Sequence, residues 1–363
     1  MRKETISVAQ LSALFLISLT GSSIVNIPQP LIGASSNAAW ISILLAYGLG
    51  LPALICILYL YRRYPGLTIV EILKQAIGPG WTAVIIIPFI SMPLMLTANI
   101  VRDISAFFTT SMMRLTPDYV FDVLILMTAA LTVKAGIEVM ARMFILLIMV
   151  MFTFIIAVLL LVLPYYQPEF LTPLLPKGFN PVLHGAYMAF GVPYADVVLL
   201  TMLMPYVRTE KGKSPGASLH IALLLHTVGL LIVTVCTIMA FGPMAGDLRF
   251  SLFQIARMVS VESIFERVES IIGVSLIVGS FMKTTIVLFV LTRVAAQLFQ
   301  FQDESIVTFP ITLIVLLLAL TMFRTDAEFR DNVAVVRPLM SFAVAYVPLV
   351  LITIAAMFKR KAR

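Results

Sequence analysis

An apolar run from Phe144 to Leu163, with Thr153 as its one polar residue, is the feature that most limits the folds open to this chain. It presents apolar side chains on every face of a helix and is long enough to cross the hydrocarbon core of a bilayer. A strand of a membrane barrel would instead alternate apolar and polar residues in short segments. The chain is 61% hydrophobic and 12% charged over 363 residues, outside the range of soluble domains. We therefore predict an all-α, multi-pass integral membrane protein.

Similar apolar stretches recur along the chain and predict ten transmembrane helices of about 20 residues each. Their predicted bounds are Val8–Leu31, Trp40–Tyr61, Trp81–Phe108, Tyr119–Val133, Phe144–Leu163, Gly185–Tyr206, Leu219–Phe241, Ile271–Leu291, Val307–Phe323 and Pro338–Phe358. A single membrane domain would then occupy residues 1–363. Lys and Arg are more frequent at one set of helix ends, which predicts that both termini are cytoplasmic. Arg249, Arg330 and Arg337 then fall on the outer side.

Glycine and proline interrupt the first and the sixth of these spans. The interruptions fall at Gly21, Ser22 and Ser23 in the first span, and at Phe190, Gly191, Pro193 and Tyr194 in the sixth. In hydrocarbon, a backbone can leave helical geometry only where protein or a water-filled cavity satisfies its polar groups. Paired breaks of this kind predict a small-solute site near the bilayer midplane, between discontinuous helices.

One break opens each set of five spans, which predicts two inverted repeats over about 6–165 and about 182–358. This is the five-plus-five arrangement of LeuT-like transporters. For the first break, the alternative is a Gly/Ser packing contact or a proline kink, both of which are common in membrane helices. For Asp196, which follows the second break, the alternative role is to cap the helix that begins there.

Lys283 lies near the middle of the eighth predicted span and is the most costly residue to place in lipid. An intramembrane ammonium group needs a partner, and we predict that Asp196 supplies it. In a LeuT-like arrangement the eighth helix approaches the first break, where transporters commonly bind sodium. Lys283 would supply a fixed positive charge there, with Thr284 and Thr285 as nearby hydrogen-bonding groups. The alternative is a lysine that faces a water-filled vestibule.

The sequence contains no phosphate-binding glycine loop, no metal-ligand spacing and no nucleophile with an evident base. We therefore expect no enzymatic activity, no cofactor and no metal. The net charge is +7, but the basic residues gather at helix ends. That placement indicates membrane lipid as the partner, not nucleic acid.

Three local segments resemble the B-subunit family of bacterial spore germinant receptors, within the amino acid–polyamine–organocation superfamily. The segments are Phe265-Glu266-Arg267-Val268-Glu269-Ser270, Ala39-Trp40-Ile41-Ser42, and Tyr64-Pro65-Gly66-Leu67 with the nearby Glu71-Ile72-Leu73. The similarity extends over essentially the whole chain. Family members often carry a tryptophan shortly after the first segment, whereas this chain has Gly273-Val274-Ser275.

The resemblance implies a nutrient-sensing subunit with a LeuT-like fold in the spore inner membrane. It also implies an A subunit and a lipoprotein C subunit as partners, and a ligand such as an amino acid, sugar or nucleoside. Carried over by position, the expected pocket joins Gly21 and its neighbours, Thr97, Val101, Phe190-Gly191, Thr284 and Thr285. Two alternatives remain open: a secondary amino-acid transporter of the same superfamily, and a passive scaffold for partner subunits.

Overall fold

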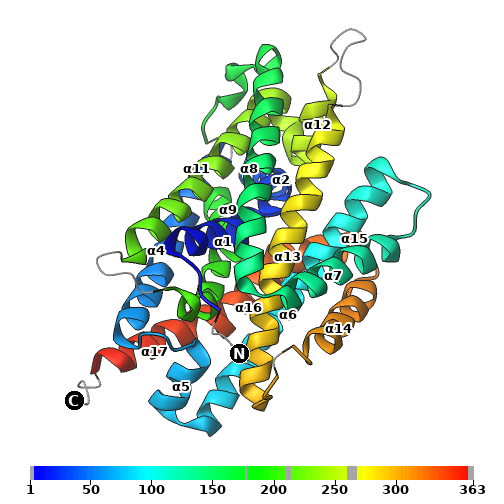
Figure 1. Cartoon of the computed structure of the whole chain (residues 1–363). Coiled ribbons are helices and arrows are strands. Elements are labelled where there is room, and N and C mark those ends of the chain that lie inside the picture. The colour runs from blue at the N-terminus through cyan, green and yellow to red at the C-terminus, as the bar shows by residue number, and fades with distance from the viewer. Residues whose placement is uncertain (1–3, 176–177, 209–213, 260–267, 304, 359–363) are drawn as a thin grey trace.

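The computed structural model describes residues 4–175, 178–208, 214–259, 268–303 and 305–358, and these residues form a bundle of helices (Figure 1). A single bridge between Ile6 and Val207 is the one extended pairing among the residues described. Part of the family-like segment noted above, Phe265 to Arg267, lies outside these ranges.

The bundle is built from helices of very different length. The α-helices are α1 Val8–Thr20, α2 Ser23–Asn26, α3 Pro28–Ser35, α4 Ala39–Arg63, α5 Ile69–Ile77, α6 Pro79–Phe107, α7 Asp118–Ala135, α8 Ile137–Leu161, α9 Asn180–Gly191, α10 Leu200–Leu203, α11 Pro215–Phe241, α12 Ser251–Arg257, α13 Glu269–Phe299, α14 Thr308–Thr321, α15 Asp326–Asp331, α16 Arg337–Ser341 and α17 Val347–Phe358. Shorter 3₁₀ segments include η5 Tyr194–Leu199, η6 Met204–Tyr206 and η7 Gly242–Gly246, while η8 Asn332–Val336 and η9 Phe342–Tyr346 are π-helical.

Eight helical stretches within the described ranges are long and apolar enough to cross a membrane. The two predicted spans outside that set coincide with α14 and α7. Helix α14 is apolar but only 14 residues long, and α7 carries Asp118, Asp122 and Lys134 within its 18 residues.

Both predicted breaks are present, so the prediction of discontinuous first and sixth helices is confirmed. Helix α1 ends at Thr20, Gly21 takes up non-helical dihedrals, and α2 begins at Ser23. Helix α9 ends at Gly191, and the chain resumes as the 3₁₀ segment η5 after Pro193. Proline cannot donate a backbone hydrogen bond, so it favours an interruption at this point.

The sixth span and α13 form the centre of the bundle. In their most apolar windows 89% and 78% of the residues are buried, against 33% for α8, which therefore lies at the periphery. Helix α13 packs against α1, α6, α7 and α8. A Cβ atom built on Gly279 would lie 2.6 Å from the carbonyl oxygen of Gly21, so glycine is required where α13 crosses the first break.

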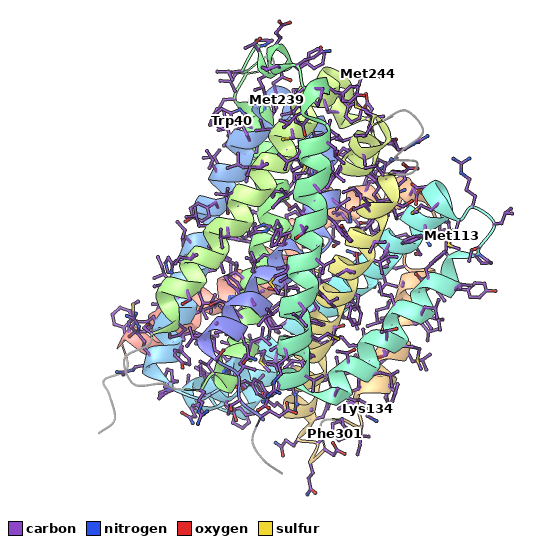
Figure 2. The ribbon with its side chains drawn as sticks, turned by 45° about the horizontal axis from the view of Figure 1, so that its top comes forward. Trp40, Met113, Lys134, Met239, Met244 and Phe301 are labelled. Atoms are coloured by element: carbon purple, nitrogen blue, oxygen red, sulfur yellow. The ribbon has the colours of Figure 1, made fainter. Side chains whose placement is uncertain are left out.

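The two ends of the bundle differ in what covers them. Helices α5 and α17 lie at one end, and α12 lies at the opposite end (Figure 1). Thr68 caps α5, and Ile69, Ile72 and Leu73 on this helix are buried against the bundle, which makes α5 amphipathic. Apolar side chains project from the surface of the bundle (Figure 2), and those exposed on the long helices include Ile87, Leu131 and Leu146, as expected for a bundle surrounded by lipid.

Candidate ligand pocket between the broken helices

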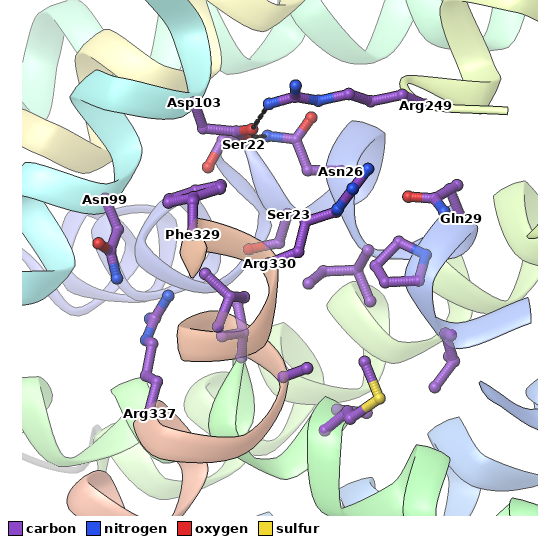
Figure 3. A pocket seen from close by; sticks show the side chains of 18 of the residues that line it. Ser22, Ser23, Asn26, Gln29, Asn99, Asp103, Arg249, Phe329, Arg330 and Arg337 are labelled. Carbon is purple, nitrogen blue, oxygen red and sulfur yellow. Dashed lines mark hydrogen bonds and ion pairs between the residues drawn. The ribbon is translucent and has the colours of Figure 1, made fainter. Parts of the chain in front are cut away.

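A cavity of about 210 Å³ opens beside the first break (Figure 3). Its walls come from α2 and α3, from α6, from the end of α9, from residues 249–250 before α12, and from residues 329–337 at the start of the last span. Segments far apart in the sequence therefore meet around one space, and both broken helices contribute to it.

The wall at the first break is polar. Ser22 and Ser23 line the cavity, and both are buried. The Nζ atom of Lys283 donates a hydrogen bond to Ser23 Oγ over 3.1 Å. Lys283 thus reaches α2 from α13, and it does so because Gly21 lets the two helices approach closely.

Behind this wall lies a buried ionic triad formed by Lys283, Asp196 and Arg337. Lys283 Nζ lies 2.9 Å from Asp196 Oδ2, and Arg337 Nη2 lies 3.2 Å from Asp196 Oδ1. The exposed fractions of these side chains are 1% for Lys283, 0% for Asp196 and 6% for Arg337, so little water screens the charges. Two cations share one carboxylate, which leaves an excess positive charge in the triad.

The predicted pairing of Lys283 with Asp196 is therefore present in the structure. The alternative, a lysine that faces a water-filled vestibule, is wrong, because Lys283 is buried and does not line the cavity. Asp196 holds two basic side chains from α13 and α16, which a capping role for its own helix would not require.

Arg337 is the member of the triad that the sequence analysis misplaced. We predicted that the last span begins at Pro338, which left Arg337 in an outer connection. In the structure, Arg337 is buried at the start of α16 and lines the cavity. The π-helical segment η8 runs directly into it, and such segments are frequent at functional sites. The apolar residues 333–336 before Arg337 were the available sequence signal, because they place it inside an apolar stretch.

Asn99 is a second cavity-lining residue that was not among the predicted site residues. It lies on α6, lines the cavity and is 3% exposed. Neither Asn99 Nδ2 nor Oδ1 has a hydrogen-bond partner among the residues described. Figure 3 shows Asn99 and Arg337 extending toward the same side of the pocket. A buried carboxamide without partners is unusual, because such a group normally finds hydrogen bonds inside the protein.

Arg249 lies at another edge of the cavity. Its Nη2 atom is 3.7 Å from Asp103 Oδ1, and its Nη1 atom donates to Asp326 Oδ2 over 2.8 Å. Asp103 also accepts a hydrogen bond from the Asn26 carboxamide. Figure 3 shows the contacts of Asp103 with Arg249 and Asn26 at the top of the view. Arg249 thus links α6 to α15 through two ion pairs at the mouth of the cavity.

Several predicted site residues lie near the breaks but outside the lining of this cavity. Thr97 and Thr285 bond within their own helices, Thr97 Oγ1 to Pro93 O over 2.7 Å and Thr285 Oγ1 to Phe281 O over 2.7 Å. Val101 and Thr284 are buried in the bundle, and Thr284 Oγ1 has no partner among the described residues. Their part in ligand binding remains a prediction.

The aromatic residues of the second break point away from the cavity. The Tyr194 hydroxyl lies 2.9 Å from Thr227 Oγ1, and its ring packs against His226. Phe190 packs edge-on against Tyr346 of the last span. A Cβ atom on Gly191 would overlap Pro338, so this glycine lets α9 and α16 meet closely. Gly191 therefore shapes the wall that brings Arg337 to Asp196.

Comparisons with known proteins identify the family to which the chain is similar. A family model described as "Spore germination protein" matches residues 5–327. Spore germination protein KB of Bacillus subtilis is 27% identical over 100% of this chain and 97% of its own length. Spore germination protein XB of Bacillus anthracis is 24% identical over 87% of this chain and 88% of its own length.

The fold also matches solved membrane transporters. MhsT in complex with L-phenylalanine gives a TM-score of 0.71 at 14% identity, covering 98% of this chain and 89% of that one. A nucleobase-cation-symport-1 family transporter bound to bromovinylhydantoin gives 0.69 at 11% identity, covering 98% and 92%. At these identities the likeness shows the fold alone, which is LeuT-like. The chain therefore belongs to the spore germination protein family, the B-subunit family of germinant receptors that its sequence resembles.

Proposed function

We propose that this chain senses a small nutrient in the cavity between its broken helices and passes that signal to partner subunits. The observation that carries the proposal is the cavity of about 210 Å³ at the meeting point of both breaks, in a chain of the spore germination family. A passive scaffold would not respond to a substitution that fills this cavity. A ligand that prefers one packing of the broken helices would shift the bundle toward that packing.

The proposed setting is the spore inner membrane, with both termini on the core side. The excess of basic residues at one set of helix ends supports this orientation. The cavity would then open outward, since Arg249 and Arg330 at its mouth lie in predicted outer connections. Two repeats of five spans, 6–165 and 182–358, remain the proposed internal organisation.

The proposed partners are an A subunit and a lipoprotein C subunit of the same receptor. Coupling to them requires a bundle with two packings that the ligand distinguishes. We propose that Lys283 acts here as a fixed charge in place of a bound cation, because its ammonium joins α13 to both breaks. Lys283→Met should therefore alter the nutrient response or subunit assembly, and an unchanged response with normal assembly would contradict this role.

Filling the cavity tests the sensing function. Val333 lines the cavity, whereas Val335, on the same π-helical segment, is 52% exposed on the outside. Spores in which this chain is the only B subunit, expressed with its A and C subunits, are exposed to a nutrient panel. We expect Val333→Trp to abolish the response and Val335→Trp to retain it. Equal responses of the two variants, at equal protein levels, would show that the cavity is not the sensor.

A secondary transporter is the second candidate, and the LeuT-like fold shared with solved transporters favours it. Uptake of radiolabelled nutrient into proteoliposomes that contain this chain alone separates the two functions. A pure receptor gives no accumulation above that of empty liposomes. Concentrative uptake that Val333→Trp abolishes would establish transport.

A further inference from the structure

The charges and the unpaired polar groups of the pocket indicate the chemical class of its ligand. We propose that the pocket binds a compact carboxylate with a hydrogen-bond donor next to the carboxyl group, recognised by Arg337 and Asn99. This inference rests on the proposed sensing function and narrows it, because sugars and other neutral solutes lack the carboxylate.

The first step is the charge balance. Lys283 and Arg337 together face the single carboxylate of Asp196, and all three side chains are almost fully buried. Arg249 is held between Asp103 and Asp326, so this second cluster adds no positive charge and carries one excess carboxylate. A buried charge without a counter-charge is unfavourable, and a ligand carboxylate beside Arg337 would supply the missing one.

The remaining charges at the cavity do not neutralise Arg337 locally. Asp103 contacts Arg249 and Asn26, and Asp326, whose side chain is 44% exposed, contacts Arg249. Arg330 and Asp331 also line the cavity, but they carry opposite charges and are exposed to solvent. Water and salt screen such exposed groups far more than they screen the triad. The unbalanced buried charge therefore lies on the Arg337 side.

The second step is the hydrogen-bonding capacity of that side. Both contacts of Arg337 with Asp196 use Nη2, and a guanidinium carries five N–H donors in a planar fork. Asn99 adds a donor, Nδ2, and an acceptor, Oδ1, neither of which has a partner among the described residues. A carboxylate accepts from Arg337 and from Asn99 Nδ2, while Asn99 Oδ1 needs a donor from the ligand. An α-amino group or an α-hydroxyl group offers that donor on the adjacent carbon.

The third step is size. A cavity volume of about 210 Å³ is below the range of about 300–1,000 Å³ that is typical of pockets for drug-sized ligands. The rest of the wall includes apolar residues such as Ile27, Ile100, Met188 and Phe250. The ligand body is therefore small and apolar, in the range of a short aliphatic side chain.

Matched ligands test this class directly. The full-length chain in lipid nanodiscs is titrated with L-alanine, L-valine and L-leucine, with their primary amides, with the corresponding 2-hydroxy acids, and with D-glucose. We expect an amino acid or a 2-hydroxy acid to bind at least ten times more tightly than its amide and than glucose, and the two acid series show which donor is used. Equal binding of acid and amide, or tighter binding of glucose, overturns the inference, as does the failure of every acid to bind.

Two variants tie the effect to the named residues. Asn99→Leu removes two atoms that make no hydrogen bond within the described protein, so it should leave thermal stability unchanged or raised while it weakens acid binding at least tenfold. Arg337→Gln leaves the Lys283–Asp196 pair in place and should remove the preference for the acid over its amide. Thr308→Val is the control, because Thr308 Oγ1 is also buried and unpaired but lies outside the cavity.

The outcomes separate this inference from the proposed function. Wild-type affinity and acid preference in both Asn99→Leu and Arg337→Gln would overturn the inference while leaving nutrient sensing in place. A normal germination response in Val333→Trp spores would instead remove the proposed function itself.

Discussion

The buried triad predicts a ranking of stability for two substitutions, Asp196→Asn and Lys283→Met, and for their combination. Asp196→Asn removes the carboxylate that Lys283 and Arg337 share, and it leaves two cations close together in a site with almost no water. Lys283→Met removes one of the two cations, and Asp196 keeps Arg337 at 3.2 Å. The loss of the carboxylate should therefore be far more destabilising than the loss of the ammonium.

Breaking a buried ion pair by removing one partner costs about 3–5 kcal/mol. We expect Asp196→Asn to lose an amount of this order in the free energy of unfolding. Lys283→Met should lose no more than about 1–2 kcal/mol, chiefly the hydrogen bond to Ser23, because it leaves a balanced pair. The double variant also lacks Lys283, so only Arg337 is left without the carboxylate. It should therefore be more stable than the Asp196→Asn variant by at least about 1 kcal/mol.

Chemical unfolding of the purified variants in detergent, followed by circular dichroism, measures these differences. The three variants and the wild type form a double-mutant cycle, and the sign of the coupling is the readout. Additive losses, or a Lys283→Met variant less stable than Asp196→Asn, would refute the view that one carboxylate holds two cations.

Three further predictions concern the first break, the edge of the cavity and the N-terminal segment. Gly279→Ala should lower stability by about 1–3 kcal/mol in the same assay, because its Cβ would collide with the main chain of the first break; Gly48→Ala, where the Cβ meets open space, should not. Arg249→Met removes the ion pairs that link α6 to α15, so it should speed dissociation of a bound acid in stopped-flow measurements. Arg257→Met, on the exposed side of α12, is the control and should leave the dissociation rate unchanged. Gly136→Ala should loosen the N-terminal segment, which would appear as faster amide exchange at residues 4–7, because Gly136 has a φ of +93° and its Cβ would overlap the Glu4 carboxylate. Unchanged dissociation in Arg249→Met, or unchanged exchange in Gly136→Ala, would contradict these readings.

Local sequence patterns were sufficient to predict the membrane bundle and its breaks. The apolar runs predict helices of spanning length, because lipid offers no hydrogen-bond partners to the main chain. Gly21 and Pro193 predict where two of these helices are interrupted. The cost of an ammonium in the membrane also predicted that Lys283 has a carboxylate partner, and Asp196 is that partner.

Only the tertiary structure decided which side chains share the cavity. Helical periodicity did not show that Thr97 and Thr285 turn their hydroxyl groups back to their own helices. Hydropathy placed Arg337 just outside the last predicted span, because a charged residue followed by a proline is typical of a helix end.

The close packing of Gly191 against Pro338 brings Arg337 to Asp196, a residue 141 positions away. The sequence by itself determined that this chain crosses the membrane and that two helices break within it. The packing of distant helices decided which charges meet at the breaks, since ion pairing depends on separation in space and not on separation along the chain.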